Sequence, residues 1–124
     1  MKNLYNVEEL NTLITRDVNS VFFLKIHEKS EFDVHLYKNI YKSILDKDIS
    51  ELNLNVLHNF QIELLRILVN QINPNDYFTL TNVDTEVCQD LIIRMVEMIK
   101  YKIDYNKDIE KKLDKEFVLA SKYL

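Results

Sequence analysis

The chain has 124 residues, of which 16 are Lys or Arg and 20 are Asp or Glu, and it contains no glycine. Average usage would give about nine glycines in this length, so the motifs that need glycine are excluded: the P-loop, the dinucleotide-binding fingerprint and the nucleophile elbow. The formal net charge of −4 disfavours a sequence-independent grip on nucleic acid.

The absence of glycine also bears on the fold. Tight β-hairpin turns and helix C-caps both prefer glycine, because it adopts positive φ at little cost. A sheet-rich fold is therefore disfavoured. We expect every residue of this chain to have a negative φ.

Length and cysteine content indicate the class of protein. A chain of this size can bury a core without a disulfide or a metal, and its single cysteine, Cys88, cannot form an internal disulfide. No stretch has the unbroken apolar run of a signal peptide or a membrane span. We expect a cytoplasmic protein with no membrane partner. The abundance of Asn, Ile and Lys is typical of AT-rich genes, such as those of low-GC bacteria, their phages and some large DNA viruses, so a phage or other mobile element is one candidate source.

The first predicted helix covers residues 7–15. Asn6 followed by Glu9 is typical of a capping box at a helix N-terminus. Behind this pair, apolar residues recur at helical spacing: Val7, Leu10, Leu13 and Ile14.

Residues 17–28 fit two structures. The spacing of Val18, Phe22 and Ile26 indicates a helix, whereas alternation through Phe22, Leu24 and Ile26 is typical of a strand. Residues 77–81 alternate in the same way. A small two-stranded ribbon between 21–27 and 77–81 is therefore the alternative to an entirely helical fold.

Two longer helices are predicted next. The first, over 31–47, can be capped by Ser30 or Asp33. The second, over 53–73, ends before Pro74, and its apolar positions cover about 240° of the circumference at 100° per residue. We expect this helix to be central, covered by neighbours on most sides, with Leu64 in the core.

Two further helices complete the prediction. One, over 83–105, can begin at Asn82 or Asp84 and buries Leu91. The other follows Asn106 and carries a narrow apolar stripe of Ile109, Leu113, Phe117, Ala120 and Leu124. No repeat or linker separates the elements, so we predict an all-α fold, a single-domain bundle of five or six helices spanning 1–124.

Histidines are the first residues to consider for a metal or catalytic site. His27 and His35 are eight residues apart across a predicted helix end, and the chain has no HExxH motif. His35 falls on a charged, solvated face. His58 falls beside Ile62, Leu65 and Val69, so we expect it to be partly buried with a local hydrogen bond.

The remaining reactive groups do not indicate catalysis either. Cys88 lies at the edge of an apolar arc, where a free cysteine acts as a small core residue. The carboxylates are scattered, and no pair is placed for acid–base chemistry. We expect no metal, no cofactor and no enzymatic activity.

Two surfaces are candidates for binding a macromolecule. Ile93 sits among charged residues on helix 83–105, and Tyr101 and Tyr105 continue that edge; apolar and aromatic groups of this kind concentrate at protein interfaces. We expect a small interaction protein that regulates or inhibits another protein, or forms a homodimer, through Ile93, Tyr101 and Tyr105. The alternative is a nucleic-acid-associated regulator that uses the Lys/Tyr segment from Lys100 to Lys107.

Overall fold

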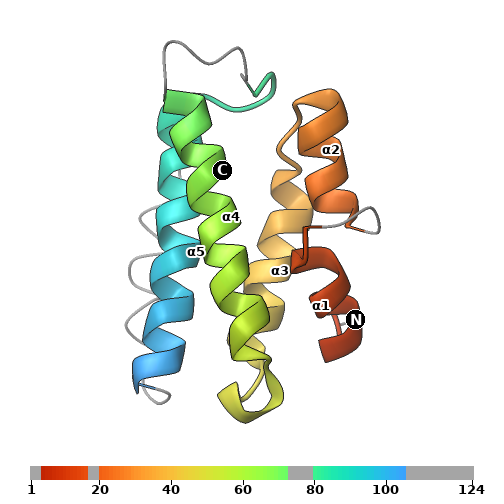
Figure 1. The fold of residues 1–124 in the computed structure, drawn as a ribbon, viewed down its shortest axis with the longest axis vertical. Coiled ribbons are helices and arrows are strands. Elements are labelled where there is room, and N and C mark those ends of the chain that lie inside the picture. Colours follow the sequence, from red (N-terminus) through yellow and green to blue (C-terminus); the bar gives the residue numbers. More distant parts are fainter. Residues whose placement is uncertain (1–3, 17–19, 73–79, 106–124) are drawn as a thin grey trace.

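The computed structural model describes residues 4–16, 20–72 and 80–105, and the regular secondary structure in these ranges is all helical (Figure 1). The described residues form five α-helices: α1 (Val7–Ile14), α2 (Val21–Lys29), α3 (Val34–Asp46), α4 (Leu54–Ile72) and α5 (Thr85–Tyr105). A short 3-10 helix, η1 (Ile49–Glu51), links α3 to α4. The predicted all-α fold is confirmed, whereas the helix predicted after Asn106 lies outside the described residues.

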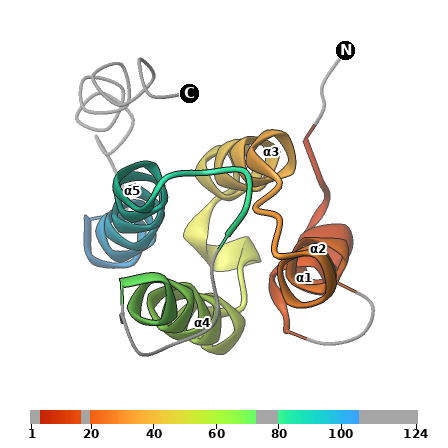
Figure 2. The same cartoon turned by 90° about the horizontal axis from the view of Figure 1, so that it is seen from above.

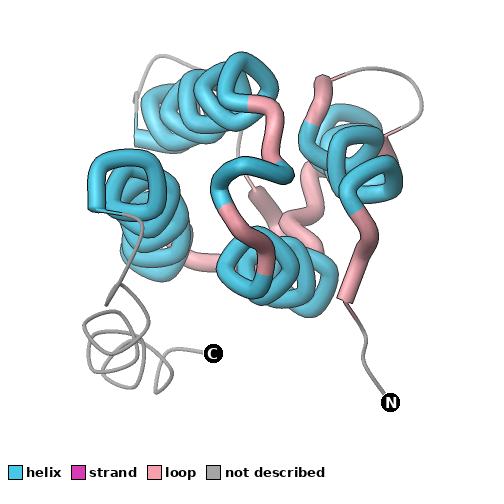
Figure 3. Tube along the Cα trace, turned by 90° about the horizontal axis from the view of Figure 1, so that it is seen from below, coloured by secondary structure: helices cyan, strands magenta, loops and turns pink. Residues whose placement is uncertain are grey.

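The helices form a bundle with four columns (Figure 2). Helices α1 and α2 are stacked end to end in one column, and α3, α4 and α5 each form another. Successive columns run in opposite directions, and α4 packs most extensively on α5. The connection through η1 passes under the bundle, so α3 and α4 lie diagonally opposite each other (Figure 3).

Polar side chains fix the starts of the helices. Asn6 and Glu9 form the predicted capping box of α1, each side chain accepting a backbone N–H of the other. Asp33 caps α3 by accepting the N–H of Leu36 at 3.0 Å, and Asn53 accepts two N–H groups at the start of α4. Because these capping residues can be recognised in the sequence, the predicted starts of these helices lie within a few residues of the observed ones.

The alternative ribbon is wrong for its first segment. Residues 21–27 belong to α2, capped by Ser20, whose hydroxyl accepts the N–H of Phe23. Most of the second segment, 77–79, lies outside the described residues.

A short pairing between two loops occurs nearby instead. The Asn82 side chain accepts the N–H of Phe32 at 2.8 Å and donates to its carbonyl at 2.7 Å, while the N–H of Thr81 donates to the carbonyl of Ser30. Asn82 thus joins two loops rather than capping α5.

One residue contradicts the expectation of negative φ throughout. Ser30 ends α2 in the left-handed region, with φ of 53°. This is the position that glycine usually occupies at a helix end. In a chain without glycine a serine takes it, and its N–H donates to the Ile26 carbonyl.

Aromatic rings form the centre of the core. The Phe22 ring lies 5.1–6.5 Å from the rings of Phe23, Phe32, Tyr37 and Phe60, measured between ring centroids. The Tyr37 hydroxyl donates to the Leu91 carbonyl at 3.0 Å, so this cluster also connects α3 to α5. Leu64 and Leu91 are buried in the same apolar core, as the sequence predicts.

Helix α4 does not have the central position that its wide apolar arc predicts. It occupies one corner of the bundle, and four of its large apolar side chains are exposed: Leu54, Ile62, Leu65 and Val69. Neighbouring helices cover one side of α4, the side that carries Leu57, Phe60 and Leu64. The apolar residues of α4 therefore span a wider arc than the side of the helix that the other described residues cover.

Candidate functional site

Most of the large apolar side chains that are exposed in the described residues belong to α4 and α5. Here the α4–α5 outer face means Ile62, Leu65 and Val69 of α4 and Ile93 and Ile103 of α5, which are 38%, 42%, 61%, 37% and 36% exposed. Isolated exposed apolar residues are normal on a protein surface. Five on two adjacent helices form a patch that needs a physical explanation.

Helix geometry places these residues on one side of the bundle. At 100° per residue, Ile62, Leu65 and Val69 lie within about 60° of one another on α4. The Gln61 side chain donates to the Val96 carbonyl at 3.0 Å, which sets the antiparallel register and marks the side of α5 that meets α4. Ile93 and Ile103 lie on either side of Val96 within about 80°, so they extend the same surface.

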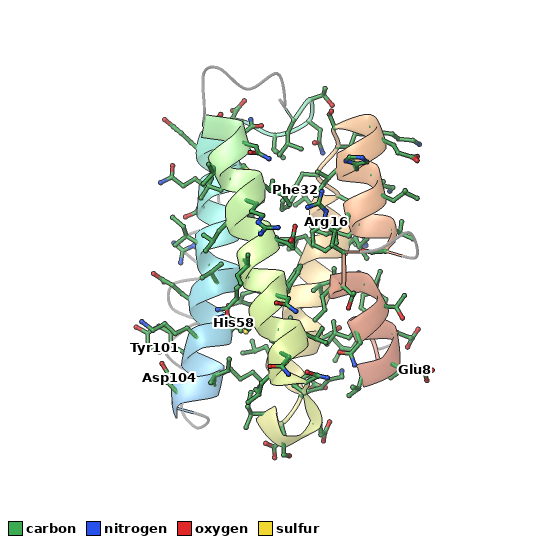
Figure 4. All side chains as sticks on the ribbon, viewed as in Figure 1. Glu8, Arg16, Phe32, His58, Tyr101 and Asp104 are labelled. Carbon is green, nitrogen blue, oxygen red and sulfur yellow. The ribbon has the colours of Figure 1, made fainter. Side chains whose placement is uncertain are left out.

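His58 lies on this side of α4, near α5 (Figure 4). The side chain is exposed, so the prediction of a partly buried histidine is wrong. That prediction followed from its neighbours Ile62, Leu65 and Val69, which were expected to be covered and are themselves exposed. His27 and His35 are also exposed, and for His35 this agrees with the predicted solvated face.

The two predicted site residues whose side chains are described, Ile93 and Tyr101, differ in exposure and position. Ile93 is exposed, but Tyr101 is half-buried against the core and lies on the side of α5 away from α4 (Figure 4). The side chain of Tyr105 lies outside the described residues. The sequence did not identify the exposed residues of α4 as part of this face. The one signal for them was that the apolar arc of α4 is wider than its neighbouring helices could cover.

The Lys/Tyr segment is less available than its sequence indicates. Lys102 is only 5% exposed, and its ammonium group donates to the Leu45 carbonyl at 3.0 Å. This lysine is therefore engaged in joining α5 to α3. Lys100 is exposed, whereas residues 106 and 107 lie outside the described part of the chain.

Cys88 is a core residue, as predicted. Burial raises the pKa of the Cys88 thiol to about 11, because the thiolate is poorly solvated there. A nucleophilic cysteine needs the opposite shift. In addition, no group of three or more His, Cys, Asp or Glu side chains within the described ranges could hold a metal ion.

Cys88 should therefore resist thiol reagents in the folded protein. With a pKa of about 11, only about one thiol in 1,000 is ionised at pH 8, and burial limits access further. Labelling with a chromogenic disulfide reagent should be slow in buffer and complete within minutes in guanidinium chloride. Stoichiometric labelling of the native protein within minutes would contradict this burial.

Comparisons with known proteins supply no family. No family model, curated protein or solved structure matches the chain. None of the described helices is long and apolar enough to cross a membrane.

Proposed function

We propose that this chain is a protein-interaction module whose α4–α5 outer face binds an apolar surface of another protein, which it thereby regulates or inhibits. The observation that carries the proposal is the gathering of five exposed apolar side chains on two helices that are held in fixed register. A rigid apolar surface favours binding because little conformational entropy is lost when a partner covers it.

The charges around this face also favour a protein partner. Glu97 lies one helical turn from Ile93 and Lys100 one turn from Val96, so the charges beside this face on α5 have mixed signs. A nucleic-acid site would need a consistently basic surface. Lys102, which the nucleic-acid alternative requires, already donates to the Leu45 carbonyl.

Paired variants test this function. Ile93→Asp should abolish capture of the partner from native extract, because it places a charge within the apolar contact, while the circular dichroism spectrum and melting temperature change little. Leu24→Asp is the matched control, since Leu24 is also exposed but lies on α2. It should leave capture intact.

Sedimentation distinguishes a second copy of this chain from a different partner. If wild type is dimeric and Ile93→Asp is monomeric, the partner is the chain itself. Capture that survives Ile93→Asp, or is lost equally with Leu24→Asp, would contradict the proposal. So would a wild-type protein that is monomeric and captures nothing.

A further inference from the structure

A groove runs along the other flank of α4, between α4 and the α1–α2 column. It contains two hollows of about 260 and 240 Å³. Arg16 and Glu63 line both of them, and their ion pair, with an N–O distance of 2.8 Å, crosses the groove. Figure 4 shows Arg16 in this position.

Glu63 holds two arginines over the larger hollow. One of its carboxylate oxygens accepts from Arg16 at 2.8 Å and the other from Arg66 at 2.9 Å. Each guanidinium has five N–H donors and makes a single hydrogen bond among the described residues, so both retain donors for a ligand. Two arginines and one glutamate leave one excess positive charge, in a chain whose net charge is −4.

The floor of this hollow is apolar. Phe23 and Ile26 of α2 and Ile67 of α4 line it, and all three are buried. A ligand here would meet hydrophobic side chains below and guanidinium donors at the rim. Apolar walls with a few convergent polar groups are typical of small-molecule sites.

We propose that this larger hollow binds a small carboxylate with an apolar body, such as an aromatic or branched aliphatic acid. Guanidinium groups match a planar carboxylate in both geometry and charge. The volume of about 260 Å³ is below the usual range for drug-sized ligands, which favours a compact molecule. This site is separate from the α4–α5 outer face and does not depend on the function proposed for that face.

Benzoate is a suitable probe for titration of the isotope-labelled chain by NMR. A ligand of this size should bind in the millimolar range and shift the resonances of Phe23, Ile26 and Ile67. Acetate and inorganic phosphate supply charge without the ring, and benzyl alcohol supplies the ring without charge. All three should bind at least about fivefold more weakly than benzoate.

Arginine variants supply the second test. Arg16→Gln and Arg66→Gln should each weaken benzoate binding about fivefold or more and leave the protein folded, because both side chains are more than half exposed. Arg94→Gln is the matched control, since Arg94 lies on α5 and pairs with Asp90. It should have no effect.

Three results would overturn the proposal. If benzoate binds no more tightly than benzyl alcohol, the arginines do not contribute to binding. If phosphate binds as tightly as benzoate, the apolar floor does not contribute to binding. Shifts confined to other residues, or equal weakening by Arg94→Gln, would place the ligand elsewhere.

Discussion

Replacing Phe22 by Ala should lower the free energy of unfolding by about 3–5 kcal/mol. Phe22 is fully buried, and its ring lies against four other rings from α2, α3, α4 and the loop before α3. Truncation leaves a cavity and removes edge-to-face and stacked ring pairs, which contribute beyond the buried area. Since domains of this size are stable by about 5–15 kcal/mol, this single change should bring the protein close to unfolding.

Leu24→Ala provides the control for this prediction. Leu24 is exposed on the same helix, two residues away, so its truncation tests helix propensity and surface contact without a core cavity. We expect it to cost less than about 1 kcal/mol. Denaturant titration of both variants measures the difference. Similar losses would show that Phe22 is not the centre of the core.

Sequence patterns predicted α1 and α3 well because two independent signals agree in each of them. In α1 and α3 the apolar spacing and the capping residues Asn6 and Asp33 indicate the same boundaries. Helix α2 was ambiguous because in nine residues a period of 3.6 is hard to distinguish from one of 2, and no capping box such as that of α1 was recognised before it. Its helical state depends on packing of Phe22 and Phe23 against distant aromatic rings, which local sequence does not reveal.

The candidate site was predicted only in part, for a related reason. Ile93 was identifiable because an apolar residue among charged neighbours on a helix is unexpected. On α4 the exposed residues Ile62, Leu65 and Val69 adjoin the residues that are buried, so periodicity alone merges the two sets into one wide arc. The arrangement of the columns decides which part of that arc is covered, and it depends on the path of the chain through η1 beneath the bundle.

The two isoleucines at positions 92 and 93 test the orientation of α5 most directly. Ile92 is fully buried and Ile93 is 37% exposed, because consecutive helical residues point about 100° apart. Ile92→Asp should therefore destabilise the protein by about 4–5 kcal/mol at neutral pH, since it places an unpaired carboxylate in the apolar core. The same change at Ile93 should cost less than about 1 kcal/mol.

Acidification should reduce the difference in stability between the two variants. Burial favours the neutral form of a carboxyl group and raises its folded-state pKa above the unfolded value of about 3.9. The penalty for Ile92→Asp is then smallest below that pH and grows as the pH rises through the folded-state pKa. Ile93→Asp should show little such dependence. Denaturant titrations of both variants between pH 3 and 7 measure this, and equal stability losses that do not vary with pH would contradict the orientation of α5 on which the α4–α5 outer face depends.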